Sequence, residues 1–250
     1  MSLITVEMKG AVAIVRLNNG ILNSLSPDLS DELRETLGRV KAEARAMVLA
    51  GGDKFFSNGL DLPTLLKLEK DEMIEFYEGF NQASLDLFTL PMPTIAAVVG
   101  HAAAGGAVLA MMCDYRFVAA GKTKIGVNEA RIGVALPYLS NLVLRQIVGD
   151  RVATDMAFTG RFLGPDQALA AGLADEIHPP GEVEDKALEK MTSLASLSPA
   201  ALAANKTVRV EEIHNRYTEN DKGRRSNKAD IDIWYEPEIR NLLAETAKKL

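Results

Sequence analysis

The sequence predicts a single α/β domain with helical appendages. Three observations indicate this class. The chain begins with two β-rich runs, a helical pattern and a third strand; a unit of strand, glycine turn, short helix and strand occurs twice before residue 127; and helical patterns dominate from about residue 138. A length of 250 residues is sufficient for one large core.

The first fifty residues are expected to form a hairpin, a helix and a strand. Residues 4–8 (ITVEM) and 11–17 (AVAIVRL) are β-rich runs separated by a Lys-Gly step, which predicts a hairpin. Ser26 and Pro27 then supply a capping hydroxyl and a proline for the first helical position. Residues 46–50 (AMVLA) predict the next strand. The apolar side chains of the helix repeat at helical spacing: Leu29, Leu33, Leu37 and Val40.

The middle of the chain is expected to pass twice from strand to helix through a glycine turn. A loop over 51–59 (GGDKFFSNG) leads into a helix that Asp61 is placed to cap. A long helix over 71–88 precedes the apolar strand 94–100 (TIAAVVG), which reads as a buried strand. Further patterns predict a helix over 105–114 and strands over 115–120 and 123–126.

The second half is expected to be mainly helical. Glycines stop three of the helices at their carboxyl ends. The expected helices cover 138–148, 151–158, 165–171, 183–197 and 199–216, with a short strand at 173–177 and a charged helical tail. We therefore divide the chain into a core over 1–197 and a carboxyl-terminal helical region over 198–250, which we expect to pack on the core or on a neighbouring subunit.

Composition and charge exclude several classes of partner. A hydrophobic fraction of 47% with 25% charged residues is ordinary for a soluble globular enzyme. The net charge is −6 and no basic block is present, so nucleic acid is not an expected partner. The first ten residues lack a targeting pattern, and no apolar run approaches the roughly 18 residues of a membrane span. We expect a cytoplasmic protein without a membrane partner.

The reactive side chains do not suggest a metal or a thiol mechanism. Cys113 is the only cysteine, which excludes an intrachain disulfide, and its apolar surroundings (VLAMMC) predict a core position. His101, His178 and His214 have no partner at the spacing of zinc ligands. We expect no metal and no separate cofactor.

The two glycine turns are the candidates for chemistry. They lie at 55–62 (FFSNGLDL) and 100–110 (GHAAAGGAVLA), where the first N–H groups of a helix lack intrahelical partners and attract negative charge. A dinucleotide fingerprint fails because Gly100, Ala102 and Gly105 stand where it needs three glycines, a P-loop lysine is missing, and no nucleophile elbow occurs. Close helix packing alone also explains such glycines. One N–H from each turn would form an oxyanion hole.

Three motifs together resemble the crotonase (enoyl-CoA hydratase/isomerase) superfamily. They are FFSNGLDL, AAAGGAVLAMMCDYRF and IGVNEARIGVALP, in the same order and at similar spacing, and the resemblance extends from residue 11 to about residue 162. It implies a crotonase-like spiral of ββα units with a helical carboxyl-terminal trimerisation region. It also implies a homotrimer or a dimer of trimers, and an acyl-CoA substrate of which coenzyme A is a part.

The resemblance also assigns roles at the site. Leu60 and Gly105 are similar in position to the two N–H donors of the family's oxyanion hole, and Glu129 to its later acid. Val108 stands where hydratases carry a second glutamate, so efficient hydration is not expected. With its single acid the chain most resembles the Δ3,Δ2-enoyl-CoA isomerase branch of the family, which implies a role in fatty acid β-oxidation. Substrate contacts are implied for Ser57, Asn58, Gly59, Asp61 and Asn128.

Other functions stay open from the sequence. The same scaffold supports hydration, thioester hydrolysis and decarboxylation, because an enolate-stabilising site serves several reactions. A non-catalytic acyl-CoA-binding protein, with Glu129 as an ordinary polar loop residue, is the alternative of another class. Asp61 and Asp114 are expected to cap and to form structural hydrogen bonds rather than to act as acids.

Overall fold

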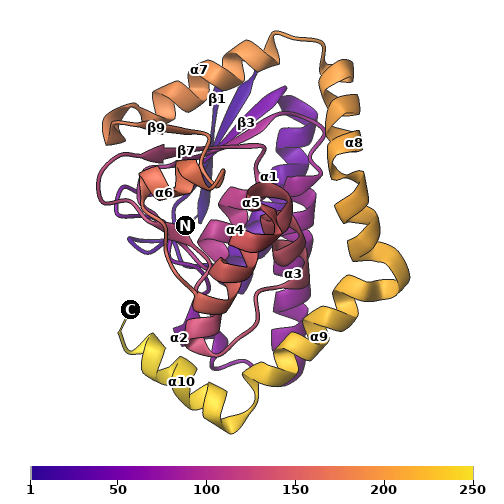
Figure 1. Cartoon of the computed structure of the whole chain (residues 1–250). Coiled ribbons are helices and arrows are strands. Elements are labelled where there is room, and N and C mark those ends of the chain that lie inside the picture. The colour runs from indigo at the N-terminus through magenta and orange to yellow at the C-terminus, as the bar shows by residue number, and fades with distance from the viewer. Residues whose placement is uncertain (1, 250) are drawn as a thin grey trace.

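The computed structural model describes residues 2–249 and combines two β-sheets with a set of covering helices (Figure 1). A six-stranded sheet has the order β1-β2-β3-β5-β7-β9, and a three-stranded sheet has the order β4-β6-β8. The strands are β1 (Ile4–Lys9), β2 (Val12–Leu17), β3 (Ala46–Ala50), β4 (Phe55–Ser57), β5 (Thr94–Val98), β6 (His101–Ala103), β7 (Tyr115–Ala119), β8 (Ile125–Gly126) and β9 (Glu176–His178).

The helices connect these strands and then form most of the second half. The α-helices are α1 (Pro27–Glu43), α2 (Leu62–Leu65), α3 (Lys70–Phe88), α4 (Gly105–Met112), α5 (Tyr138–Thr159), α6 (Pro165–Ala170), α7 (Val183–Ala195), α8 (Pro199–Thr218), α9 (Lys222–Trp234) and α10 (Pro237–Ala247). Three short 3₁₀ helices are η1 (Glu129–Ile132), η2 (Pro180–Glu182) and η3 (Glu219–Asp221). The expected α/β fold with carboxyl-terminal helices is confirmed.

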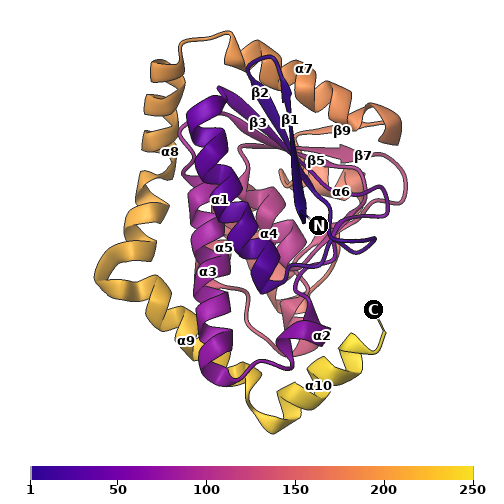
Figure 2. The same ribbon diagram turned by 180° about the vertical axis from the view of Figure 1, so that it is seen from behind.

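The central strands β2, β3, β5 and β7 of the large sheet are buried on both faces, to which successive side chains of a strand point alternately, whereas the edge strand β1 is exposed beyond Ile4. The predicted hairpin is confirmed, with β1 and β2 antiparallel and Ile4 opposite Leu17, while the other strand pairs of this sheet are parallel. Val48 and Ala50 pack with α7 on one face, and Met47 and Leu49 pack with α1 and α3 on the other. Figures 1 and 2 show α7 lying across the sheet from α1 and α3.

The small sheet was not expected from the sequence. We expect residues 55–57 and 101–103 to be parts of a loop and a glycine turn, but they form β4 and β6, which pair in parallel with each other. Strand β6 also pairs with β8, which lies within the strand expected over 123–126. Runs of three residues carry no readable periodicity, so only pairing across the chain defines β4 and β6. This sheet sets the two glycine turns side by side.

Most other expected elements are confirmed, with different bounds. Ser26 caps α1, and its hydroxyl accepts the Leu29 N–H at 3.3 Å. The expected helix after residue 61 is only the four-residue α2. The two helices expected over 138–158 join as α5, although Gly149 at their junction has φ 76° and ψ 161°, so the predicted break is present in the backbone.

Helices α8, α9 and α10, here called the C-terminal arm, run along the outside of the molecule (Figures 1 and 2). The arm packs on the core through α9 and α3 and through α8 and α5, as expected for the tail. Asp114 binds Lys206 and Arg209 of α8, each at 2.6 Å, and accepts the Thr94 N–H at 2.9 Å, which confirms its structural role.

The division of the chain at residue 197 stays a prediction. No helix within residues 2–249 has the length and apolar character needed to cross a membrane.

Candidate active site

The first glycine turn follows β4 and is held by buried hydrogen bonds. The Ser57 hydroxyl donates to the Asn23 carbonyl at 2.7 Å and accepts the Gly59 N–H at 3.1 Å. The Asp61 N–H donates to the Leu25 carbonyl at 3.1 Å. Among the described residues, no hydrogen bond is formed by the intervening N–H of Leu60. The turn therefore satisfies the N–H groups on both sides of Leu60 and leaves that donor available.

The second glycine turn follows β6 and opens α4. Ala104 is the N-cap residue with φ 46° and ψ −121°, a conformation that side chains rarely adopt. Such strain costs about 1–3 kcal/mol and gathers at functional sites. Gly105 is the first residue of α4, so its N–H has no intrahelical acceptor, and none is found elsewhere within residues 2–249. The strained residue thus presents a second donor at a helix amino terminus.

The two turns contact each other directly. A Cβ placed on Gly59, whose φ is +91°, would lie 2.9 Å from the Ala103 carbonyl oxygen and 3.1 Å from the Gly105 nitrogen. A Cβ on Gly106 would lie only 2.3 Å from the Ser57 carbonyl oxygen. Both glycines are needed because backbone meets backbone here. The Leu60 and Gly105 donors consequently belong to one small region, as an oxyanion hole requires.

Glu129 is a buried acid beside these turns. It is the first residue of η1 and only 8% exposed, and its Oε2 has no hydrogen-bond partner among the described residues. Burial raises the pKa of Glu129 to about 7. Asn128, just before it, also has a buried Oδ1 without a partner in the described chain. A buried carboxyl that titrates near neutrality is suited to accept and return a proton.

A cavity of about 110 Å³ joins the turns and the acid. Its lining comes from elements spread over most of the chain: Asn58, Leu60, Leu62, Tyr77, Phe80, Ala103, Ala104, Gly105, Val108, Asn128, Glu129, Ile132, Val134, Ala135, Pro137, Phe162, Trp234 and Thr246. Glu129 is the one acid among the described residues that line it. Val108 is 1% exposed and adds an apolar surface to the lining.

The matching family model is described as "Enoyl-CoA hydratase/isomerase" and covers residues 7–237. The chain belongs to this family. A putative enoyl-CoA hydratase of Thermus thermophilus is 36% identical over 204 residues, which are 79% of this chain and 80% of that protein. The mouse protein named enoyl-CoA delta isomerase 1, mitochondrial, is 31% identical over 194 residues, 76% of this chain and 67% of its own length. The crotonase resemblance stated from the motifs is therefore confirmed.

The fold agrees with the family. The crystal structure of human mitochondrial delta3-delta2-enoyl-CoA isomerase superposes with a TM-score of 0.94 at 23% identity, covering 99% of this chain and 98% of that one. At this level of identity the likeness shows the fold alone. Because the coverage includes the C-terminal arm, the arm has the same arrangement relative to the core as in that structure.

In this member of the family, three of the predicted substrate-binding residues shape the first turn instead of lining the cavity. Ser57 is fully buried, Gly59 makes the close backbone approach, and Asp61 caps α2, accepting the Thr64 hydroxyl at 2.8 Å and the Thr64 N–H at 3.3 Å. Their contact with substrate stays a prediction. Asn58 and Asn128 do line the cavity.

Several lining residues of this family member were not found by sequence reasoning. Tyr77, Trp234 and Thr246 lie far from the glycine motifs in the sequence, and each is an ordinary position on an amphipathic helix. No local pattern distinguishes them. The cavity also adjoins a groove that shares Asn58, Ala103 and Phe162 with it; the groove is further lined by Phe55, His101, Gly121, Lys122, Thr123, Lys124 and Gly164.

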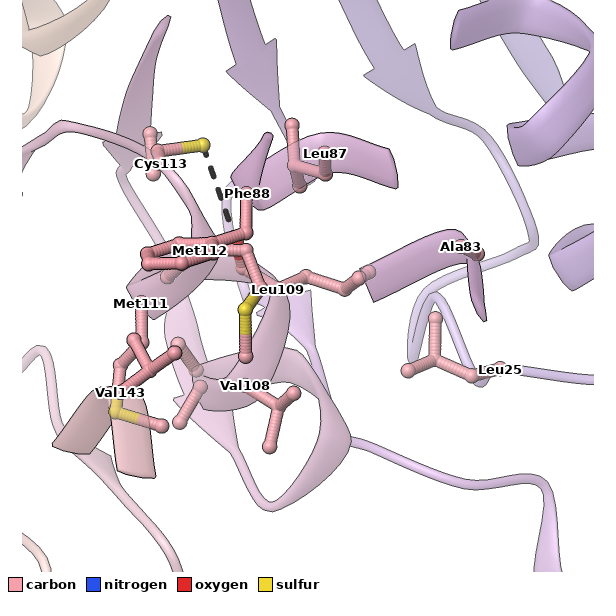
Figure 3. Close-up of a cluster of buried hydrophobic side chains, with 14 of the residues drawn as sticks. Leu25, Ala83, Leu87, Phe88, Val108, Leu109, Met111, Met112, Cys113 and Val143 are labelled. Atoms are coloured by element: carbon pink, nitrogen blue, oxygen red, sulfur yellow. Dashed lines mark hydrogen bonds between the residues drawn. The ribbon is translucent and has the colours of Figure 1, made fainter. Parts of the chain in front are cut away.

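Cys113 takes no part in this site, as predicted. Figure 3 shows it at the end of α4 in a cluster of buried apolar side chains that includes Leu109 and Phe88. It is fully buried, its Sγ lies 3.9 Å from the Leu109 carbonyl oxygen, and burial raises the pKa of the thiol to about 12. A thiol held protonated in this way is not a nucleophile.

Proposed function

We propose that this chain isomerises 3-enoyl-CoA to 2-enoyl-CoA by a proton transfer through Glu129. The observation that carries the proposal is that Glu129 is the one acid among the described residues that line the cavity. Val108, which by the family resemblance stands where hydratases carry a second glutamate, lines the cavity as an apolar side chain. Hydration needs a water molecule held and activated, usually by two carboxylates. A 1,3-proton transfer needs one group that serves first as base and then as acid.

The proposed reaction has two proton-transfer steps. The Glu129 carboxylate removes a proton from C2 of the substrate, and the electron pair of that C–H bond moves into the thioester to form a dienolate. The Leu60 and Gly105 N–H groups stabilise the negative charge on its oxygen, each by about 2.7–4 kcal/mol. Glu129 then returns the proton at C4, the carbonyl re-forms, and the double bond lies between C2 and C3.

The adjoining groove supports an acyl-CoA ester as the substrate. It meets the cavity at Asn58, Ala103 and Phe162, and it carries Lys122 and Lys124. Two ammonium groups close to the cavity mouth suit the phosphates of coenzyme A. In this proposal coenzyme A lies in the groove, the thioester at the two turns, and the acyl chain in the cavity, with no further cofactor. The homotrimer or dimer of trimers, the cytoplasmic location and a place in fatty acid β-oxidation stay predictions.

The direct test compares wild-type protein with Glu129→Gln on 3-hexenoyl-CoA, following 2-hexenoyl-CoA formation. Loss of the base is expected to lower kcat by about 10²–10⁴. The amide keeps the size of the carboxyl, so binding of saturated hexanoyl-CoA serves as the control and should persist. Equal turnover by both proteins would remove Glu129 from this role.

The same assay separates the alternatives through their products. Formation of 3-hydroxyacyl-CoA as the main product would indicate a hydratase, and release of free coenzyme A a thioester hydrolase. Loss of carbon dioxide from a malonyl-type thioester would indicate a decarboxylase. Tight binding of several esters without turnover of any would favour an acyl-CoA-binding protein.

A further inference from the structure

The C-terminal arm forms part of the wall of the candidate cavity. The cavity meets the lysine-bearing groove through Asn58, Ala103 and Phe162. Trp234 of α9 and Thr246 of α10 line the cavity and not the groove. Since coenzyme A is proposed to occupy the groove, the arm faces the part of the cavity that receives the acyl chain. Figure 1 shows α9 and α10 wrapping this end of the molecule, next to α2 and α3.

The enclosed space is small. A volume of about 110 Å³ is below the roughly 300–1,000 Å³ of pockets that hold drug-sized ligands. The thioester carbonyl takes part of it, so the remainder suits a short acyl chain.

Trp234 contributes bulk to this wall rather than a hydrogen bond. It is the only tryptophan of the chain and is 3% exposed. Its Nε1 has no hydrogen-bond partner in the part of the chain that the structure describes. The indole therefore occupies space next to Tyr77 and Phe80 of α3, which line the same cavity. Replacing Trp234 with a smaller apolar side chain therefore enlarges the cavity without breaking a polar contact.

The wall is fastened to the active-site side of the core. The Tyr235 hydroxyl donates to the Leu68 carbonyl at 2.8 Å, and Arg240 donates from Nη2 to the Leu66 carbonyl at 2.7 Å. The Arg240 guanidinium also lies 4.7 Å from the centre of the Tyr235 ring. Leu66 is the C-cap of α2, the helix that directly follows the first glycine turn. Residue 234 is thus held in a set position relative to the two turns.

We propose that Trp234 limits the length of the acyl chain that this protein accepts. The inference rests on the proposed acyl-CoA chemistry, and it specifies the substrate class as short-chain esters. A chain that reaches the indole has no further space, because Tyr235 and Arg240 fix the arm to the core just after residue 234. Longer chains bind only when that side chain is made smaller.

The test is a chain-length profile of kcat/KM for 3-enoyl-CoA esters of six to fourteen carbons. The wild-type ratio of the twelve-carbon to the six-carbon value is expected to be one tenth or less. Trp234→Ala should raise this ratio at least tenfold, and Trp234→Leu should raise it by an intermediate factor. Phe158→Ala removes an aromatic side chain that is 81% exposed and outside the cavity, so it should leave the ratio unchanged.

An unchanged ratio in both Trp234 variants, or a wild-type ratio near one, would overturn the proposal. If Trp234→Ala does not fold, as judged by its thermal transition, the Trp234→Leu variant decides.

Failure of the isomerase proposal is distinguishable from failure of the length limit, because the wild-type protein then converts no 3-enoyl ester. In that case calorimetry measures the binding affinities for hexanoyl-CoA and dodecanoyl-CoA, and their ratio replaces the ratio of kcat/KM values. A selective gain of at least fivefold for dodecanoyl-CoA in Trp234→Leu supports the length limit, and equal changes for both esters contradict it.

Discussion

The two glycine turns present the same kind of donor but are built differently. The first turn is held by hydrogen bonds, with Ser57 joining the Asn23 carbonyl to the Gly59 N–H. In the second turn, no such side-chain bond is found at Ala104, Gly105 or Gly106 among the described residues. Ala104 holds a strained backbone, and α4 behind it is apolar and buried throughout. Packing therefore holds the second turn in its conformation, whereas polar contacts hold the first.

This difference teaches which changes each turn tolerates. When one bond of a hydrogen-bonded turn is removed, the free energy of unfolding falls by a limited amount, because each buried group left without a partner costs about 1–3 kcal/mol. A turn defined by close packing has no room for added atoms, and overpacking costs about 1–3 kcal/mol or more. The predictions below test this contrast, from the largest expected effect to the smallest.

Gly106→Ala is expected to have the largest effect. The new Cβ would lie 2.3 Å from the Ser57 carbonyl oxygen, which is backbone and cannot rotate away. We expect the free energy of unfolding to fall by about 3–4 kcal/mol, with loss of activity, because the two turns must separate. Urea unfolding measures the change. Gly38→Ala is the matched control: a Cβ there meets nothing within 4 Å, so it should be neutral or stabilising. Equal stability of the two variants would contradict close packing of the turns.

The pH dependence reports on the acid between the turns. Burial raises the pKa of Glu129 to about 7, and the base must be ionised to act. We therefore expect kcat/KM to rise with pH and level off above 7, with a gain of about a hundredfold between pH 5 and pH 8. A profile that is flat down to pH 5 would show that the acid has an ordinary pKa.

The raised pKa also predicts a change in stability. Folding favours the protonated form of Glu129, so its contribution declines as pH rises from 4.5, the ordinary value, to about 7. At pH 8 the ionised group lowers the free energy of unfolding by up to about 3 kcal/mol. Glu129→Gln should recover part of this at pH 8 and little at pH 4, as thermal unfolding at the two pH values would show. A variant that is less stable at pH 8 would contradict the buried charge.

Ser57→Ala tests the hydrogen-bonded turn. It leaves the Asn23 carbonyl and the Gly59 N–H without their partner, and we expect a loss of about 2 kcal/mol in the free energy of unfolding. The Leu60 donor should shift with the turn, so kcat should fall by a larger factor than the affinity for the substrate. Ser196→Ala, which removes an exposed serine bond, is the control and should change neither. A fully active and stable Ser57→Ala would show that packing also holds the first turn.

Ala104→Gly is expected to have the smallest effect. Glycine relieves the strain of φ 46° and ψ −121° but adds freedom to the unfolded chain, so we expect a gain in stability of about 1 kcal/mol or less. Activity should be retained, because the Gly105 N–H keeps its position at the helix start. A clear loss of stability, measured by urea unfolding, would show that the methyl group packs usefully and that the backbone is not strained.

Local patterns predicted much of the fold. The hairpin, the capped α1, the strand β3, the break at Gly149 and the caps at Ser26 and Asp61 depend on neighbours within a few residues, and the structure confirms them. The strand predicted over 123–126 contains β8, but the small sheet as a whole could not be predicted, because β4 and β6 are too short to show a period. The cavity wall from the C-terminal arm could not be predicted either, since no motif marks the helix positions that face it.

The sequence by itself determined the order of the elements, the two glycine turns and the presence of one acid after Asn128, because these depend on residue identity and short spacing. Only the tertiary structure decided that a Cβ on Gly59 would lie 3.1 Å from the Gly105 nitrogen, and that Glu129 is buried enough to titrate near 7. It also decided that Trp234 lines the cavity. The physical reason is that contact, burial and desolvation arise between segments far apart in the chain, and no local pattern encodes their distance.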